Sequence, residues 1–330
     1  MTRSQQTTDQ TRLAMVGMVE GNGHPYSWSA IVNGYNPEKM ADCPYAVIPE
    51  YLGEQPLEEV SIPGASVTHI WTDDPADAKD VAAAAEIPNI VDEPTDVIGE
   101  VDGIIIPTDD GDNHVSRVKP FLDSDLPVFV DKPLATNLED LRIFIRWHND
   151  GYSIASSSAL RYASEVDSLI NSADALGKIR WITNATHKTW PRYGIHRIEP
   201  VARLLGPGFE TVECLDRGGT ETYTITHQTG PTITIGVRDD LRGGSGRLTA
   251  YGTTGDYTID STDTYTAFRR QLLAVIKFVE TGEPDVKFEE TIDLMACIIA
   301  GRWSKHENRQ VEISEIYNSL PIGQHSTGER

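Results

Sequence analysis

The stretch LAMVGMVEGNGHPYSW, residues 13–28, decides the fold class. Its apolar start, residues 13–19, predicts a strand buried on both faces, as in a parallel sheet. Gly21 and Gly23 follow this strand, and residues 27–35 predict a short helix. A strand, a glycine turn and a helix in this order are typical of a loop that holds the phosphates of a dinucleotide.

The glycine pattern G-x-G-x-x-G is incomplete, because its third glycine position is Tyr26. The third glycine normally lets helix and strand pack closely, so Tyr26 predicts a displaced helix and looser phosphate packing. A register shifted by one, with Glu20 at the first glycine, stays open. In either register we expect an altered cofactor turn whose contacts come from Gly21, Asn22 and Gly23.

The first half of the chain alternates strands and helices. Further strands are predicted at residues 65–71, 101–108, 127–133 and 152–160, and clear helices at 74–87 and 138–150. Residues 36–64, rich in Pro, Tyr and Glu, predict an inserted loop. Repeated strand–helix units predict a doubly wound parallel sheet of the α/β class, with its ligand at the carboxyl ends of the strands.

The second half has a different pattern. Alternating stretches at 179–188, 210–216, 220–228, 231–239 and 246–252, separated by turn residues, predict a largely antiparallel sheet. Helices are predicted at 164–177, 266–282 and 288–304. We therefore expect a nucleotide-binding domain at 1–157 and an α+β domain at 158–330, which binds substrate and forms a homo-oligomer through its sheet.

The charge balance is strongly acidic, with 50 Asp and Glu against 28 Lys and Arg. A net charge of −22 repels phosphate backbones, which argues against nucleic acid as a partner. Salt screens such self-repulsion, so the composition favours a halophilic source, with an ordinary acidic cytosolic protein as the alternative. The N-terminus lacks an apolar signal segment, and no apolar run reaches the ~20 residues that cross a bilayer. We expect a cytoplasmic protein without a membrane partner.

Lys132 is the strongest candidate for chemistry. It stands in VFVDKPLAT, just past the carboxyl end of a predicted buried strand, between Asp131 and Pro133. A lysine there can donate or relay a proton in the ligand crevice. The alternative is a surface lysine paired with a carboxylate.

Other polar residues follow the predicted strands. His24 and His114 lie in loops at the ligand edge, where each could bond phosphate or ribose, or only cap a helix. Arg161 could reach the cofactor or form an interdomain ion pair. The histidines lack H-x-x-x-H spacing and Cys43, Cys214 and Cys297 lie far apart, so neither a metal site nor a disulfide is predicted.

The end of the second strand should read the adenosine ribose. Thr72 stands at the usual acid position and is followed by Asp73 and Asp74. Carboxylates there bond ribose hydroxyls and repel a 2′-phosphate, which favours NAD over NADP. The alternative is that one of these aspartates only caps the following helix.

The order and spacing of several segments resemble the glucose-fructose oxidoreductase/inositol dehydrogenase (Gfo/Idh/MocA) family over about residues 12–315. The segments are IIIPTDDGDNH (104–114), DKPLA (131–135), SSSALRY (156–162) and YGIHRIEPVARLLG (193–206). The resemblance implies a Rossmann-type domain and an NAD-dependent dehydrogenase or reductase of a sugar, cyclitol or related polyol. It also implies a dimer or tetramer.

The resemblance assigns roles to individual residues. It implies that Lys132 is the active-site lysine and that His196 binds substrate or moves a proton. The family often has Asp four residues before this histidine, where this chain has Arg192; the adjacent Tyr193 could donate a phenolic proton instead. Further cofactor contacts are implied for Thr108, Asp109, His114, Asp131, Lys132, Pro133 and Arg161.

Two other functions stay open. The incomplete glycine pattern and Arg192 are compatible with a non-catalytic ligand sensor on the same scaffold. An enzyme that retains NAD tightly and uses it for an internal epimerisation or elimination is the other alternative.

Overall fold

The computed structural model describes residues 10–241 and 246–321, which form two compact units. Unit 1 comprises residues 10–131, 153–163 and 263–286. Unit 2 comprises 132–152, 164–262 apart from the undescribed 242–245, and 287–321. The division by function at residue 157 stays a prediction.

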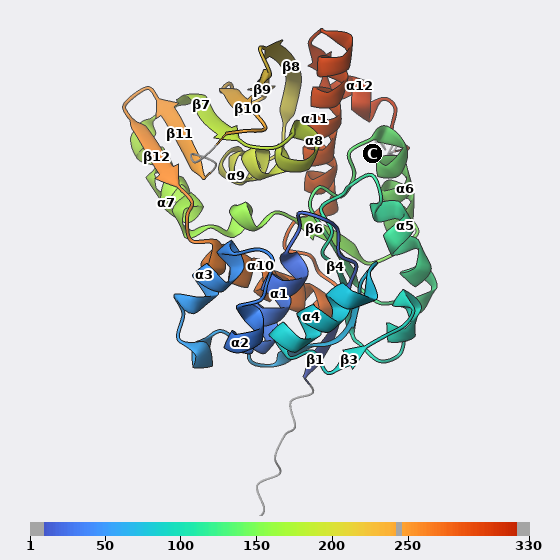
Figure 1. Ribbon diagram of the computed structural model, residues 1–330. Helices are drawn as coiled ribbons and strands as arrows, with labels where there is room; N and C mark the ends of the chain where they lie inside the picture. Colours follow the sequence, from blue (N-terminus) through green and yellow to red (C-terminus); the bar gives the residue numbers. More distant parts are fainter. Residues whose placement is uncertain (1–9, 242–245, 322–330) are drawn as a thin grey trace, which may run out of the picture. The chain divides into compact units, whose positions relative to one another are not determined.

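Unit 1 contains the predicted parallel sheet (Figure 1). Its strands are β1 (Thr11–Val16), β2 (Ala65–Trp71), β3 (Asn89–Ile90), β4 (Gly103–Ile106), β5 (Val128–Asp131) and β6 (Ile154–Ser157). Their order is β3-β2-β1-β4-β5-β6, and every neighbouring pair is parallel. The doubly wound Rossmann-type fold is confirmed, and strand order reverses between β1 and β4, where such sheets bind nucleotides.

The helices of unit 1 connect and cover these strands. They are α1 (His24–Asn33), α2 (Pro37–Met40), α3 (Val47–Gly53), α4 (Pro75–Ala85), α5 (His114–Val118) and α10 (Thr264–Thr281), with 3₁₀ helices η1 (Leu57–Glu59), η2 (Pro94–Val97), η3 (Lys119–Ser124) and η4 (Ala159–Tyr162). Residues 36–64 therefore contain α2, α3 and η1, so the prediction of a plain loop there was wrong. Met40 and Leu52 of this segment are fully buried, and that burial stabilises its short helices.

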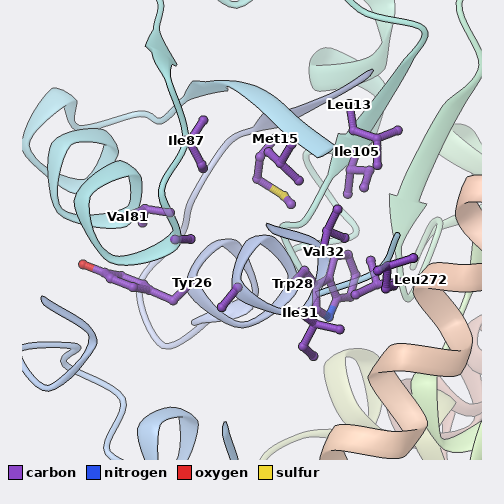
Figure 2. Close-up of a cluster of buried hydrophobic side chains, with 14 of the residues drawn as sticks. Leu13, Met15, Tyr26, Trp28, Ile31, Val32, Val81, Ile87, Ile105 and Leu272 are labelled. Atoms are coloured by element: carbon purple, nitrogen blue, oxygen red, sulfur yellow. The ribbon is translucent and has the colours of Figure 1, made fainter. Parts of the chain in front are cut away.

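The core of unit 1 lies between the sheet and helices α1, α4 and α10. Figure 2 shows Leu13 and Met15 of β1 with Ile31 and Val32 of α1 and Leu272 of α10. The β1 residues 13–16 are at most 2% exposed, which explains why the strand is apolar without alternation.

Unit 2 is built on a seven-stranded mixed sheet. Its strands are β7 (Ile179–Thr186), β8 (Phe209–Arg217), β9 (Thr220–His227), β10 (Thr232–Val237), β11 (Arg247–Gly252), β12 (Asp256–Asp260) and β13 (Val311–Glu312), in the order β12-β11-β7-β10-β9-β8-β13. The pair β7–β10 is parallel and the other pairs are antiparallel. The largely antiparallel second sheet is thus confirmed.

Helices of unit 2 pack beside this sheet. They are α6 (Leu138–Asn149), α7 (Ser164–Ser172), α8 (Trp190–Tyr193), α9 (Ile195–Leu205), α11 (Phe288–Glu307) and α12 (Ile313–Tyr317), with the 3₁₀ helix η5 (Ala173–Leu176). Most of α11 is buried between residues 291 and 301. Gly301 on this helix leaves room for the fully buried Trp190 of α8, whose indole nitrogen would lie 2.3 Å from a Cβ at position 301.

Candidate active site

The glycine turn joins β1 to α1 in unit 1. β1 ends at Val16, and Gly17 and Gly21 have φ values of +104° and +77°, which glycine adopts without strain. Helix α1 begins at His24, directly after Gly23. Helix α1 thus starts directly after the glycine pair Gly21 and Gly23. Residues 17–20 lie between the end of β1 and this pair and lengthen the turn.

Asn22 ties this turn to the end of β4. Its Nδ2 donates to Pro107 O at 2.8 Å, and its Oδ1 accepts the His24 backbone amide at 2.8 Å. Pro25, the next helical residue, has no amide proton. The first two positions of α1 therefore offer no free amide to a phosphate, and the phosphate-binding capacity of this helix end is reduced.

Gly23 makes room for protein rather than only for a ligand. A Cβ on Gly23 would lie 2.6 Å from Tyr45 Cδ2 and 2.6 Å from Ile48 Cδ1. The Tyr45 phenol also forms a hydrogen bond with the Gly21 backbone, which lowers the pKa of the phenol. Burial has the larger effect, so this pKa is raised. The inserted segment 36–64 therefore forms a wall of the glycine turn, which sequence reasoning did not find.

Tyr26, at the third glycine position, is buried. Its side chain belongs to the same core cluster as Val81 and Ala82 of α4 (Figure 2). Burial, and then the nearby Asp80, raise the pKa of this phenol, so it stays neutral. The small alanines of α4 provide space for the ring, which is how the chain accommodates the missing glycine.

His24 reaches from the start of α1 to the end of β5. Its Nδ1 donates to Asp131 Oδ2 at 2.8 Å, and Asp131 is buried. The imidazole stacks on Trp28 with centroids 4.6 Å apart and meets the edge of Phe268 at 5.2 Å. These contacts fix the ring across the carboxyl edge of β1, β4 and β5, where the cofactor is expected.

Two exposed carboxylates, Asp73 and Asp74, follow the end of β2. Thr72 is buried and donates to Asp74 O at 2.6 Å, while Asp74 caps α4 by accepting the Ala76 amide at 2.9 Å. Asp73 accepts from the Met18 amide at 3.1 Å and from Arg117 at 3.0 Å, yet 45% of its side chain is exposed. Asp73 is thus the residue of the three best placed to accept ribose hydroxyls.

Residues after β4 are mostly turned inward. Thr108, Asp109 and His114 are all buried, and His114 Nε2 donates to Thr108 O at 2.8 Å. His114 thus braces the segment that follows β4. Arg161, on η4, is half-buried. The cofactor contacts of all four stay predictions.

The three residues predicted to be catalytic lie together in unit 2. Lys132 follows Asp131 and is buried, and the peptide bond between Lys132 and Pro133 is cis. Its Nζ lies 6.0 Å from the centroid of the Tyr193 ring. The His196 ring meets the Tyr193 ring edge to face, with centroids 5.1 Å apart. Tyr193 is therefore the centre of this cluster.

Sequence reasoning missed two members of the cluster. The Lys188 Nζ donates to the Tyr193 hydroxyl at 2.6 Å, and the His187 ring lies 4.7 Å from the Tyr193 ring. Both follow the end of β7, which was predicted to continue through residue 188 but ends at Thr186. Two basic residues at a strand end, directly before the Tyr193 helix, were the available signal.

Trp190 holds the helix that carries Tyr193. Its indole nitrogen donates to Ile298 O at 2.9 Å, and its ring stacks on Tyr223 with centroids 4.0 Å apart. Because α8 spans only residues 190–193, this anchor sets the position of Tyr193.

Helix α9 adds two buried charged residues beside His196. Glu199 is buried on α9, three residues after His196. Burial lowers the pKa of the Arg197 guanidinium to about 10. A buried carboxylate and a desolvated cation therefore lie on the same helix as His196.

The residues of unit 1 fit a dinucleotide. The strand reversal, the two glycines at positive φ and the exposed carboxylate of Asp73 supply a nucleotide edge, and His24 continues it toward β5. Among residues 10–241 and 246–321, no three His, Cys, Asp or Glu side chains are placed to hold a metal ion. Over the same residues, no helix is long and apolar enough to span a membrane.

Residues 49–149 match the family model described as "Oxidoreductase family, NAD-binding Rossmann fold", GFO_IDH_MocA. The match includes the β2 end and Lys132 but begins after the glycine turn. It confirms the family resemblance inferred from the sequence motifs. No curated protein matches the sequence significantly.

Solved structures with the same fold cover most of the chain. A probable dehydrogenase from Thermotoga maritima has a TM-score of 0.70 at 16% identity, covering 92% of this chain and 99% of its own. The apo scyllo-inositol dehydrogenase of Lactobacillus casei has 0.73 at 12%, covering 93% and 99%. The myo-inositol dehydrogenase of Lactobacillus casei, in complex with NAD(H) and myo-inositol, has 0.69 at 15%, covering 92% and 96%. At these identities the likeness shows the fold alone.

Proposed function

We propose that this chain, whose residues 49–149 carry the NAD-binding Rossmann fold of the Gfo/Idh/MocA oxidoreductases, is an NAD-dependent dehydrogenase or reductase. Its substrate is a sugar, a cyclitol or a related polyol or keto compound. The observation that carries the proposal is the gathering of Lys132 and His196 around the Tyr193 ring. This cluster offers a cation and two proton carriers, which the oxidation of an alcohol requires.

The roles follow from the chemistry of an alcohol. When bound, the nicotinamide accepts or gives the hydride. The Lys132 ammonium stabilises the negative charge that develops on the substrate oxygen, which an unassisted alcohol does not carry at neutral pH. Tyr193 or His196 takes the hydroxyl proton and returns it in the reverse direction. The relay thus has a phenol where the family often has an aspartate.

NAD is the proposed cofactor, and Asp73 is the reason. Its exposed carboxylate can accept two ribose hydroxyls, whereas a 2′-phosphate at the same place is repelled. Arg117 lies beside Asp73 and neutralises part of this charge, so NADP is disfavoured rather than rejected outright.

Titration with NADH tests the cofactor. The six tryptophans should transfer excitation energy to bound NADH at micromolar to millimolar concentrations. Turnover is then followed as NADH formation with a panel of sugars and cyclitols. Lys132→Met should lower turnover by roughly 100-fold or more. Lys178→Met, at an exposed lysine of unit 2, is the matched control and should leave it unchanged.

The results separate three functions. Absence of NADH and NADPH binding at millimolar concentration refutes the dehydrogenase. A non-catalytic sensor, favoured by the reduced phosphate-binding capacity of α1, predicts that Lys132→Ala keeps the biological phenotype. Absorbance near 340 nm in the purified protein would instead indicate a retained cofactor used for epimerisation or elimination.

The setting of the protein is also proposed. We infer a cytoplasmic enzyme of a salt-rich cell, because a net charge of −22 is best tolerated where salt screens repulsion. The exposed Trp181 and Tyr251 stack on each other at 5.1 Å on neighbouring strands of the unit 2 sheet. This aromatic pair supports a homo-oligomer interface on that sheet face. Sedimentation of the protein at several concentrations would test it.

A further inference from the structure

Tyr193 is in direct contact with an ammonium that the proposed mechanism has not used. Lys188 Nζ lies 2.6 Å from the phenolic oxygen and 4.3 Å from the ring centroid. Lys188 has φ +59°, which a residue with a side chain rarely adopts. The backbone between β7 and α8 therefore holds this lysine in a costly conformation directly beside Tyr193, and such conformations cluster at functional sites.

We propose that Lys188 is the positioning residue that makes Tyr193 the base of the reaction, by holding its phenolic oxygen ready to lose a proton. A cation in hydrogen-bond contact stabilises the phenolate over the phenol. The second cation, Lys132, lies on the same ring at 6.0 Å and acts in the same direction. Tyr193 is then a better proton acceptor than His196, whose ring meets the Tyr193 ring edge to face.

Among the described residues, basic groups that contact Tyr193 or adjoin it in the chain come from several elements. Lys188 and His187 lie on the connection after β7, and Lys132 follows β5. His196 lies on α9, and Arg192 precedes Tyr193 on α8 itself.

Two buried carboxylates belong to the same stretches of chain: Glu199, on α9 one turn beyond His196, and Asp131, directly before Lys132. A carboxylate opposes the ionisation of a phenol, whereas the ammonium in contact with the oxygen favours it. Coulomb energy falls with distance, so the contact at 2.6 Å is the larger influence.

The step is a proton transfer that accompanies the hydride transfer of the proposed function, on which this inference rests. The substrate O–H bond breaks, and its proton forms a bond with the phenolate oxygen of Tyr193. The electron pair of the O–H bond becomes the second bond of the carbonyl as the C–H bond gives up its hydride. Tyr193 ends as a neutral phenol that still accepts the Lys188 hydrogen bond, and solvent removes its proton before the next turnover.

Tyrosine ionisation tests the inference without knowledge of the substrate. Tyrosinate absorbs near 295 nm, so difference absorbance between pH 6 and 11 follows each phenol. The wild type should show one tyrosine with a midpoint roughly 1–3 pH units below the ordinary value of about 10. Burial raises the pKa of several other tyrosines, including Tyr51, Tyr223 and Tyr317, so an early transition stands out.

Four variants assign that transition. Tyr193→Phe should remove it, and Lys188→Met should move it upward by at least 1 pH unit or so. Lys188→Arg keeps the charge and should retain most of it. Lys178→Met, the exposed control, should leave it unchanged. Circular dichroism confirms that each variant is folded, and NADH titration should give unchanged affinity in all four.

The outcomes are distinguishable from failure of the proposed function. If no tyrosine ionises early, or if Lys188→Met leaves the early transition in place, this inference is wrong even when NADH binds normally. If the early transition depends on Lys188 but the wild type does not bind NADH, the Lys188–Tyr193 pair stands and the dehydrogenase is refuted.

Discussion

Gly301→Ala should destabilise the protein, although Ala is the better helix former. Gly301 lies within α11, where Ala alone would gain about 1 kcal/mol over Gly. A Cβ at this position would lie 2.3 Å from Trp190 Nε1 and 2.6 Å from Trp190 Cε2. Propensity and packing therefore predict opposite signs for the same substitution.

The packing effect is larger because Trp190 has no place to move. Tyr223 stacks on its other face at 4.0 Å, and its indole N–H is bound to Ile298 O. Overpacking costs about 1–3 kcal/mol, and a buried indole donor that loses its acceptor costs about 1–3 kcal/mol more. After subtracting the helix gain, the unfolding free energy should fall by about 3 kcal/mol, within a range of about 1–5 kcal/mol.

Urea unfolding at fixed pH and salt measures this change. Gly53→Ala in α3 is the control, because a Cβ there meets nothing within 4 Å. It should be neutral or slightly stabilising. A Gly301→Ala protein as stable as the wild type would show that Trp190 moves without cost, and the packing argument would be wrong.

Three further predictions concern pH, salt and cofactor choice. Arg309, and then the Glu312 amide, lower the pKa of Glu315 from 4.5 to about 2. Between these pH values the unfolded chain binds more protons than the folded chain, so the free energy of unfolding falls as the pH falls. Glu315→Gln should flatten the dependence of the urea-measured unfolding free energy on pH in this window. Raising KCl from about 0.1 to about 2 M should raise the Tm, because the Debye length shrinks from ~10 Å to below 3 Å; a constant or falling Tm in calorimetry would count against a halophilic protein. Asp73→Asn should reduce the ratio of NADH affinity to NADPH affinity by roughly tenfold, because it removes the repelling charge and leaves Arg117 to bind the 2′-phosphate. If fluorescence titrations give the same ratio for the wild type and the variant, Asp73 does not bind the adenosine ribose.

The fold was predictable because its signals are local. Apolar runs identified β1, β4 and β5, mixed segments at 65–71 and 152–160 identified β2 and β6, and alternation identified the second sheet. β3 escaped because it has only two residues, both exposed. The helices of residues 36–64 escaped because their stability comes from packing, such as that of Met40 and Leu52, and not from a periodic pattern.

The candidate site was predictable only in part. Lys132 was found from its place after a buried strand, and Tyr193 and His196 through the family resemblance; Lys132 Nζ lies 6.0 Å and the His196 ring centroid 5.1 Å from the centroid of the Tyr193 ring. Lys188 was not found, because β7 was predicted to run through it; two basic residues before the Tyr193 helix were a signal, but the positive φ and the contact with Tyr193 depend on the fold. Tyr45 was missed for a similar reason, since its contact with Gly23 is made by a folded insertion.

The contact between Gly23 and Tyr45 also constrains how this chain can evolve. A larger residue at position 23 collides with the Tyr45 ring, while loss of the ring leaves a gap above the turn. Neither substitution is tolerated well alone, and even together they leave Ile48 Cδ1 2.6 Å from a Cβ at position 23, so a change at position 23 requires changes at both neighbours. Packing against Tyr45 and Ile48 thus requires glycine at position 23 independently of any nucleotide that the turn binds.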